Sequence, residues 1–231
     1  RDLRMSRGLG DVYKRQIRDI FNVGLAVAIM NSINAITTII LNRILSSNGV
    51  TILGTYFKVQ SFIFMPVFGL TQGAMPIMGY NYGAKEKERF LKTFQLSMLT
   101  SFIIMTVGLL IFQFGSEIIT ASFQLGDISN LAIRAFRIIS LCFIPAAISI
   151  IISSMFQAIG HGYKSTLMSI LRQAVILIPT ALILKIITKN DDAIWWAYPI
   201  SEIGCCLIFI FVTSYTIKHL FITKKEEIKA I

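Results

Sequence analysis

Apolar residues in this chain come in runs that are too long for the helices of a soluble protein. Each run is long enough to cross a hydrocarbon core of about 30 Å, because a helix rises about 1.5 Å per residue. The pattern predicts six transmembrane helices, at about residues 20–45, 52–80, 94–115, 130–158, 165–188 and 194–218. The connections between them are short, so neighbouring helices should be antiparallel. We therefore expect an all-α integral membrane fold, a bundle of six transmembrane helices.

The composition supports this fold class and excludes several others. Hydrophobic residues make up 55% of the 231 residues and charged residues 15%, whereas a soluble domain has about 45–50% apolar and about 25% charged residues. The excess excludes a soluble enzyme, an all-β domain, a disordered chain and a secreted disulfide scaffold. The cysteines at 142, 205 and 206 lie inside apolar runs without metal-ligand spacing, so we expect small buried thiols.

The net charge of +10 is distributed in short basic clusters between the apolar runs. This is the pattern of cytoplasmic loops, and it argues against a nucleic-acid partner. With the N-terminus inside, the inner side holds Lys85, Lys87, Arg89, Lys92, Lys164, Lys218, Lys224, Lys225 and Lys229, and the outer side holds Arg43, Arg134, Arg137, Lys185 and Lys189. The bias predicts a multi-pass protein of the inner (plasma) membrane of the cell, with both termini in the cytoplasm.

The two ends of the chain differ from the apolar runs between them. Residues 1–16 read RDLRMSRGLGDVYKRQ, which is polar, basic and without the apolar region of a signal peptide. The stretch MSRGLGDVYKRQ resembles translated sequencing-adapter read-through, so we expect residues 1–16 to be a non-native leader. The transmembrane lobe is expected at 17–222, followed by a cytoplasmic tail at 223–231.

Three ionisable residues lie at membrane depth, where a charge is costly and usually faces the interior of a bundle. Lys58 lies about 9 Å below the outer end of the second span, and Glu202 lies about 12 Å below the outer end of the sixth. Because these depths match, the two side chains could pair in an outward-facing cavity. Arg172 enters from the inner side of the fifth span, and we do not expect it to reach them.

Polar stripes on separate helices indicate a polar pathway through the bundle. At about 100° per residue, one stripe of the second span carries Lys58, Ser61, Met65 and Gln72, and one stripe of the first carries Asn31, Asn34 and Thr38. With Glu202, these residues are our candidates for a substrate or ion pathway. The alternative is that the polar side chains only hydrogen-bond neighbouring helices. Our hypothesis is that Glu202 couples transport to H⁺ or Na⁺ while Lys58 holds it ionised.

Motifs of membrane enzyme chemistry are absent from the sequence. There is no GxxxxGK[ST], HExxH or GxSxG motif, and the two histidines, His161 and His219, lie at span ends. We therefore expect neither an enzyme nor a protein with a cofactor or bound metal. The pair Trp195–Trp196 is predicted to anchor its helix at the membrane interface.

Three segments carry a family resemblance. They read GLTQGAMPIMGYNYGAKEKERF at 69–90, SSMFQAIGHGYKSTLMSILRQAVILIPTALIL at 153–184 and WWAYPISEI at 195–203. In order and spacing they resemble the C-terminal six-helix lobe of multidrug and toxic compound extrusion (MATE) transporters. The resemblance implies one lobe of a twelve-helix transporter that exports cationic or amphipathic compounds in exchange for Na⁺ or H⁺. It also implies two further partners, the lipid bilayer and a missing N-terminal lobe of the same polypeptide.

Two alternatives to an antiporter stay open at this point. The first is a flippase of lipid-linked oligosaccharides or polysaccharides with a related fold, which should have a more cationic cavity. The second is a non-transporting membrane subunit or scaffold. Within the resemblance, the candidate pathway residues would line the central cavity.

Overall fold

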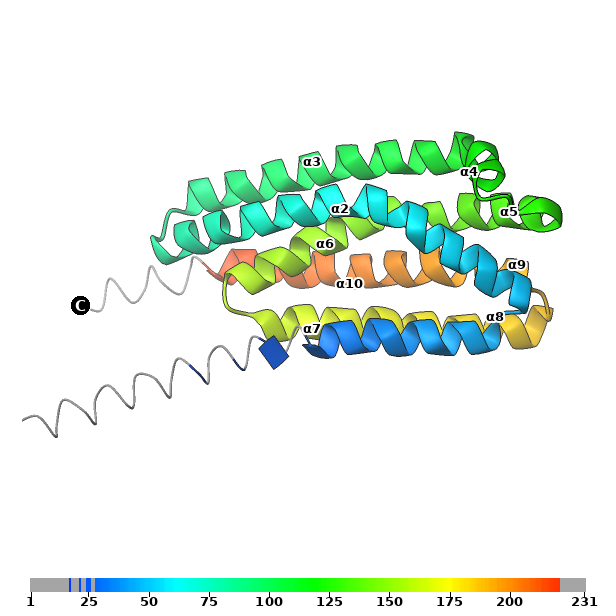
Figure 1. Cartoon of the computed structure of the whole chain (residues 1–231). Helices are drawn as coiled ribbons and strands as arrows, with labels where there is room; N and C mark the ends of the chain where they lie inside the picture. Colours follow the sequence, from blue (N-terminus) through cyan, green and yellow to red (C-terminus); the bar gives the residue numbers. More distant parts are fainter. Residues whose placement is uncertain (1–16, 18–20, 22–23, 26–27, 221–231) are drawn as a thin grey trace, which may run out of the picture.

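The structure is a computed structural model, and it describes residues 17, 21, 24–25 and 28–220. The predicted leader at 1–16 and the predicted tail at 223–231 lie outside the described residues. Among the described residues the regular elements are all helical (Figure 1). The predicted all-α fold is confirmed.

The long helices of the described residues run side by side as rods and alternate in direction along the chain (Figure 1). The first helix is described without gaps over residues 28–44. The remaining rods are α2 (Ser47–Gly83), α3 (Lys87–Phe114), α5 (Ser129–Ser140) with α6 (Phe143–Ala158), α7 (Gly162–Ile170) with η2 (Leu171–Leu177) and α8 (Ile178–Thr188), and α10 (Ala197–Leu220). Three short helices complete the described chain, α4 (Ser116–Ser122), η1 (Gly126–Ile128) and α9 (Asp191–Ile194).

We name the two ends of the bundle after Lys85 and Asp191. The Lys85 end carries the turn between α2 and α3 and the turn between α6 and α7. The Asp191 end carries the turn from the first helix into α2 at residues 45–46, the segment 115–128, and the turn before α9 (Figure 1).

Membrane-length helices account for most of the described residues. Four stretches are long and apolar enough to span a bilayer, at Ser47–Gly83, Lys87–Phe114, Gly162–Thr188 and Asp191–Lys218. A fifth consists of Gly126–Ser140 and Phe143–Ala158, which meet at a bend of 46°. At 37 residues, α2 is longer than a straight crossing of about 20 residues requires. It must therefore tilt or extend into the interface.

The core of the half towards the Asp191 end is aromatic. Phe112 packs edge-to-face on Tyr56, Phe136 and Phe143 at centroid distances of 5.5, 5.7 and 5.2 Å. Trp195 is only 1% exposed and belongs to the same cluster. The interfacial-anchor prediction was therefore wrong for Trp195, because its indole fills the core where α9 turns into α10. Trp196, at 46% exposure, is the outward-facing member of the pair.

Small and buried side chains let the rods approach one another. Along α3, Ser97, Ser101 and Gly108 lie on the side that packs on α2 and α6. This is the small-residue interface that close helix packing in a membrane needs. The three cysteines are buried and free, which confirms the prediction of small buried thiols.

A π-helical segment, η2, interrupts the fifth rod between α7 and α8. Pro179, the second residue of α8, has no backbone N–H to give to a carbonyl of the preceding turn. Such π-helical turns are rare and frequently occur at functional sites. Here η2 packs against α10 and carries Arg172.

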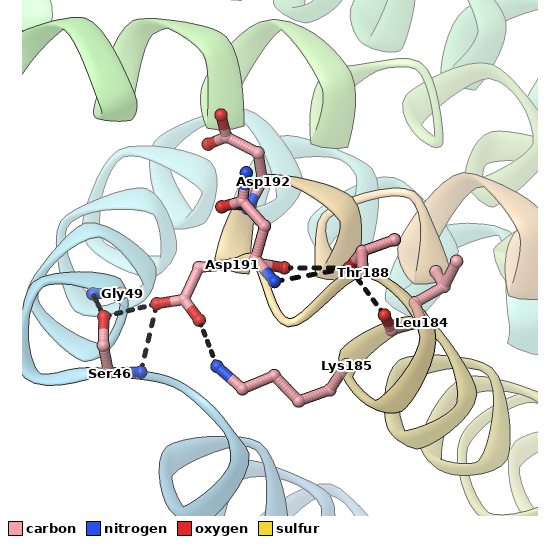
Figure 2. A network of polar contacts seen from close by, with 8 residues as sticks. Ser46, Gly49, Leu184, Lys185, Thr188, Asp191 and Asp192 are labelled. Atoms are coloured by element: carbon pink, nitrogen blue, oxygen red, sulfur yellow. Dashed lines mark hydrogen bonds and ion pairs between the residues drawn. The ribbon is translucent and has the colours of Figure 1, made fainter.

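A polar network joins several rods at the Asp191 end (Figure 2). Asp191 accepts a hydrogen bond from the Ser46 backbone N at 3.1 Å and another from the Ser46 hydroxyl. Its other oxygen pairs with Lys185 Nζ of α8 at 2.7 Å. The neighbouring Asp192 pairs with Arg134 of α5 at 3.0 Å. Because Ser46 is the N-cap of α2, one carboxylate ties the start of α2 to α8.

We expect Asp191→Ala to destabilise the folded chain by about 1–2 kcal/mol, because it removes a charge-assisted pair and the group that holds the α2 cap. Asp192→Ala is the matched control. Its partner Arg134 has a side chain that is 59% exposed, and exposed pairs contribute about 0–1 kcal/mol. Unfolding of both variants in detergent, followed by circular dichroism, measures the difference. Equal losses in the two variants would contradict a special role for Asp191.

Candidate transport cavity

A cavity of about 550 Å³, open to the surface of the lobe on one side, lies between the first helix, α2, α6, η2 and α10. Its wall combines aromatic rings with polar groups. The aromatic residues are Tyr56, Phe57, Phe64, Phe68 and Tyr198, and the polar or charged ones include Asn34, Thr37, Thr38, Gln60, Ser61, Arg172, Gln173, Ser201 and Glu202. We call it the main cavity.

One ion pair crosses the main cavity. Arg172 Nη1 of η2 donates to Glu202 Oε1 of α10 at 2.9 Å, and the two side chains are 25% and 12% exposed. Among the described lining residues these two are the only charged side chains. The cavity therefore has no net charge while the pair is intact.

Several buried polar atoms of the cavity wall lack a good partner. Thr37 Oγ1, Tyr56 Oη, Tyr198 Oη and Glu202 Oε2 make no hydrogen bond of good geometry with a described residue. Only the Cys142 thiol approaches the Tyr56 hydroxyl loosely, and Ser149 does the same at the Glu202 carboxylate. Buried polar groups are usually paired. Four buried polar atoms without a well-placed hydrogen-bond partner, all around one space, indicate a cavity built for water or for a polar ligand.

A smaller hollow of about 160 Å³ adjoins the main cavity, and Arg172, Phe68 and Ile150 line both. Hydroxyl and amide groups dominate its polar wall, which consists of Thr71, Gln72, Ser149, Ser153, Ser154, Gln157 and Ser169. We call it the serine-lined hollow. The Arg172 guanidinium thus stands at the boundary between two polar spaces.

The candidate pathway residues fall into three groups. Asn34, Thr38, Ser61, Met65 and Glu202 line the main cavity, and Gln72 lines the serine-lined hollow. Asn31 and Lys58 are exposed, and neither is among the residues that line these two spaces. Whether the residues form a transport pathway stays a prediction.

Arg172 corrects one sequence-based expectation. The matching depths suggested that Lys58 could pair with Glu202, and we did not expect Arg172 to reach them. In the structure Arg172 holds the carboxylate, and Lys58 forms no ion pair with a described residue. Arg172 and Glu202 approach the middle from opposite ends, and the remaining gap is short enough for the long arginine side chain to bridge. Lys58 lies at the margin of the cavity-lining face of α2, about 20° beyond Met65 at 100° per residue.

Other cavity residues had no signal strong enough to find them. Gln173 of η2 donates from its amide to Asn34 Oδ1 of the first helix, which closes one side of the main cavity. Tyr56 and Tyr198 look like ordinary apolar-face aromatics in sequence, and only their packing shows that the two rings lie 6.4 Å apart at the cavity. For Arg172, the signal in the sequence was an ionisable residue at membrane depth.

The part of the chain that the structure describes holds no cluster of three or more His, Cys, Asp or Glu side chains that could bind a metal ion. His161, in the turn between α6 and α7, has a pKa lowered by burial, with a further lowering from Lys164. It therefore adds little charge to the Lys85 end at neutral pH.

Comparison with known families gives a match over most of the chain. The family described as MatE matches residues 23–183. Among curated proteins, the multidrug export protein MepA of Staphylococcus saprophyticus is 25% identical over 217 residues, which cover 92% of this chain and 48% of MepA. MepA of Staphylococcus aureus is 24% identical over 221 residues, with 94% and 48% covered. The chain thus spans about half the length of the curated relatives it matches.

Solved structures show the same fold. An outward-facing MATE family transporter matches with a TM-score of 0.83 at 20% identity, covering 88% of this chain and 47% of the other. An inward-facing one matches at 0.81 and 20%, with 88% and 48% covered. A Pyrococcus furiosus transporter, described as having a binding pocket of reversed polarity, matches at 0.82 and 20%, with 89% and 48% covered.

The shared fold agrees with the resemblance carried by the three sequence segments. Members of the family are transporters and not enzymes, as the sequence predicted. The family match ends in α8, so it includes Arg172 but stops before Glu202. Because it covers well over half of the residues, the chain belongs to the MatE family of multidrug and toxic compound extrusion transporters.

Proposed function

We propose that residues 17–222 are the C-terminal lobe of a secondary multidrug exporter, which moves cationic or amphipathic compounds out of the cell in exchange for H⁺ or Na⁺. The observation that carries this proposal is the main cavity. Aromatic walls and a single carboxylate surround about 550 Å³ of space inside a membrane bundle. A second lobe, in the half of the relatives that this chain does not cover, would complete the transporter.

The cavity chemistry suits flat amphipathic ligands. Rings of Phe57, Phe64 and Phe68 offer apolar faces, and Met65 adds an adaptable thioether side chain that is 66% exposed. A cationic group on such a ligand would find one carboxylate, that of Glu202. The exposed side chains of Asn34 and Ser61 mark where this space meets the surface of the lobe.

Glu202 is our candidate for ion coupling. It is the one acidic side chain among the described lining residues of either space. H⁺, Na⁺ and a cationic substrate would all compete for it, which is the minimum requirement of an exchanger. Asn31, Asn34, Thr38, Ser61, Met65 and Gln72 would form the polar walls of the route, with Lys58 at its margin.

The Lys85 end is proposed to face the cytoplasm, with both termini on that side of the cell membrane. The support is the bias in lysine and arginine number between the two sides, because cytoplasmic loops carry the excess of these residues. Ion pairing does not separate the two ends, since Lys85 at one end and Lys189 at the other are both exposed and form no ion pair with a described residue.

The flippase alternative receives no support from the cavity. A diphosphate headgroup needs an excess of positive charge, whereas the one arginine among the described lining residues is neutralised by Glu202. A scaffold needs no internal cavity at all. An exporter of organic cations therefore remains the proposal.

Efflux by living cells tests this function. Long-read sequencing across the codons for Gln16 and Ile17 recovers the gene, which is expressed in bacteria that lack their own multidrug exporters. Ethidium efflux is then followed by fluorescence under imposed proton or Na⁺ gradients. We expect efflux that needs one of the two gradients and is lost in Glu202→Gln, with the exposed Glu88→Gln as control. Retention of ethidium by cells whose membranes contain the folded protein would rule the function out.

A further inference from the structure

We infer that Arg172 is an internal competitor of cationic substrates for Glu202, and that its guanidinium moves into the serine-lined hollow when a substrate displaces it. The inference rests on the proposed function, because it concerns the same cavity. It assigns Arg172 a role in exchange rather than in folding alone. It also assigns the hollow, which adjoins the main cavity at Arg172, as the second position of this side chain.

The charge balance of the main cavity makes Arg172 a competitor of an entering cation. Glu202 is occupied by Arg172 at 2.9 Å, and no second acid lines the space among the described residues. A cation that enters therefore meets a carboxylate already paired with a cation. It can bind there only by displacing the guanidinium or by sharing Glu202 with it.

The titratable groups around Glu202 leave Arg172 as the charged competitor. The others that face it within the described structure are the phenol of Tyr56 on α2 and the thiols of Cys142, Cys205 and Cys206. A buried phenol or thiol is uncharged at neutral pH. The state of Glu202 is therefore decided between Arg172 and whatever cation arrives.

Arg172 and Glu202 each keep hydrogen-bonding atoms that have no well-placed partner. Of the guanidinium groups, Nη1 alone has a hydrogen-bond acceptor among the described residues, although guanidinium has five N–H donors. On the acid, Oε2 is buried without a well-placed donor. A pair retained for stability would be expected to be fully hydrogen-bonded. The Arg172–Glu202 pair instead keeps unpartnered donors and an unpartnered acceptor, which a second arrangement of the side chains could use.

The serine-lined hollow offers the Arg172 guanidinium a second position. The serine-lined hollow begins at Arg172 itself and holds about 160 Å³. Its hydroxyl and amide oxygens are uncharged acceptors that suit a displaced guanidinium. The Ser149 hydroxyl is buried at 2% exposure without a well-placed partner, and Gln72 is exposed. The position on η2 also fits, because π-helical turns frequently occur at functional sites.

The test is binding of tetraphenylphosphonium, a lipophilic monovalent cation, to the purified chain in nanodiscs. We expect Arg172→Gln to tighten binding by about tenfold, since a competitor that occupies the site nine-tenths of the time weakens apparent affinity by about that factor. Glu202→Gln should remove most of the binding. A purely structural role for Arg172 predicts the opposite sign, because a damaged site binds more weakly.

A second variant tests the hollow without touching the pair. Gln72→Leu removes an amide acceptor from an exposed position of α2, and Asn130→Leu is the matched control on α5, exposed and outside both spaces. We expect Gln72→Leu to weaken tetraphenylphosphonium binding, because the displaced guanidinium loses an acceptor, and Asn130→Leu to leave it unchanged.

Two results would overturn the inference. One is weaker binding by Arg172→Gln, and the other is unchanged binding by Gln72→Leu with Asn130→Leu. Neither result touches the proposed function, which depends on gradient-driven ethidium efflux by the full-length protein. Conversely, cells that retain ethidium would remove the exporter proposal even if the chain binds the cation as expected.

Discussion

Replacing Arg172 by Ala should destabilise the folded chain by about 3 kcal/mol, because it leaves the Glu202 carboxylate buried without a compensating charge. Glu202 is 12% exposed and has no other charged partner among the described residues. Thermal or SDS-induced unfolding of the purified chain, followed by circular dichroism, measures the loss. Lys58→Ala is the control, since Lys58 is exposed and pairs with no described residue.

A double variant separates the effect of the pair from that of its surroundings. Arg172→Met combined with Glu202→Gln removes both charges while keeping most of the volume. We expect this double variant to regain most of the stability that Arg172→Ala loses, since a buried ion pair replaced as a unit is often close to neutral. If the double variant is as unstable as the single one, the cost comes from lost packing at η2 rather than from the unpaired charge.

The sequence predicts the membrane-length helices of the described residues well, because length and hydrophobicity alone decide which segments can cross a bilayer. It predicts the interruptions less well. The fourth rod breaks between Ser140 and Phe143 with a bend of 46°. Pro145 is the reason, since it cannot donate to the carbonyl of Leu141 four residues earlier. That signal was present, but a proline alone does not say whether a membrane helix bends or continues straight.

The cavity shows the same division between what one helix can reveal and what several together decide. Helical periodicity placed Ser61 and Met65 on one face of α2, and both line the main cavity. Periodicity is a property of one helix, so it could not select the partner of Glu202. That choice depended on two helices entering from opposite ends and on the reach of one arginine. Pairing between helices is set by tertiary packing, which a single sequence does not contain.

A close contact between α2 and α3 at Gly108 gives the second large effect. Gly108 of α3 lies so near α2 that an added Cβ would stand 2.3 Å from Ile63 Cγ2 and 3.3 Å from Phe143 Cδ2. Ile63 is β-branched and held in one rotamer on its helix, so it cannot turn aside. Gly108→Val should therefore force the two helices apart and destabilise the chain by about 2–3 kcal/mol.

The same substitution at Gly54 is the matched control, because a Cβ there meets no atom within 4 Å. Gly54→Val should be neutral or slightly stabilising, since valine has a higher helix propensity than glycine. Adding Ile63→Ala to Gly108→Val removes the atom that clashes and should restore part of the lost stability. Unfolding midpoints of the four proteins decide the matter. If Gly108→Val and Gly54→Val have the same unfolding midpoint, the two helices can separate without loss of stability. Close packing by small residues would then not hold this bundle together.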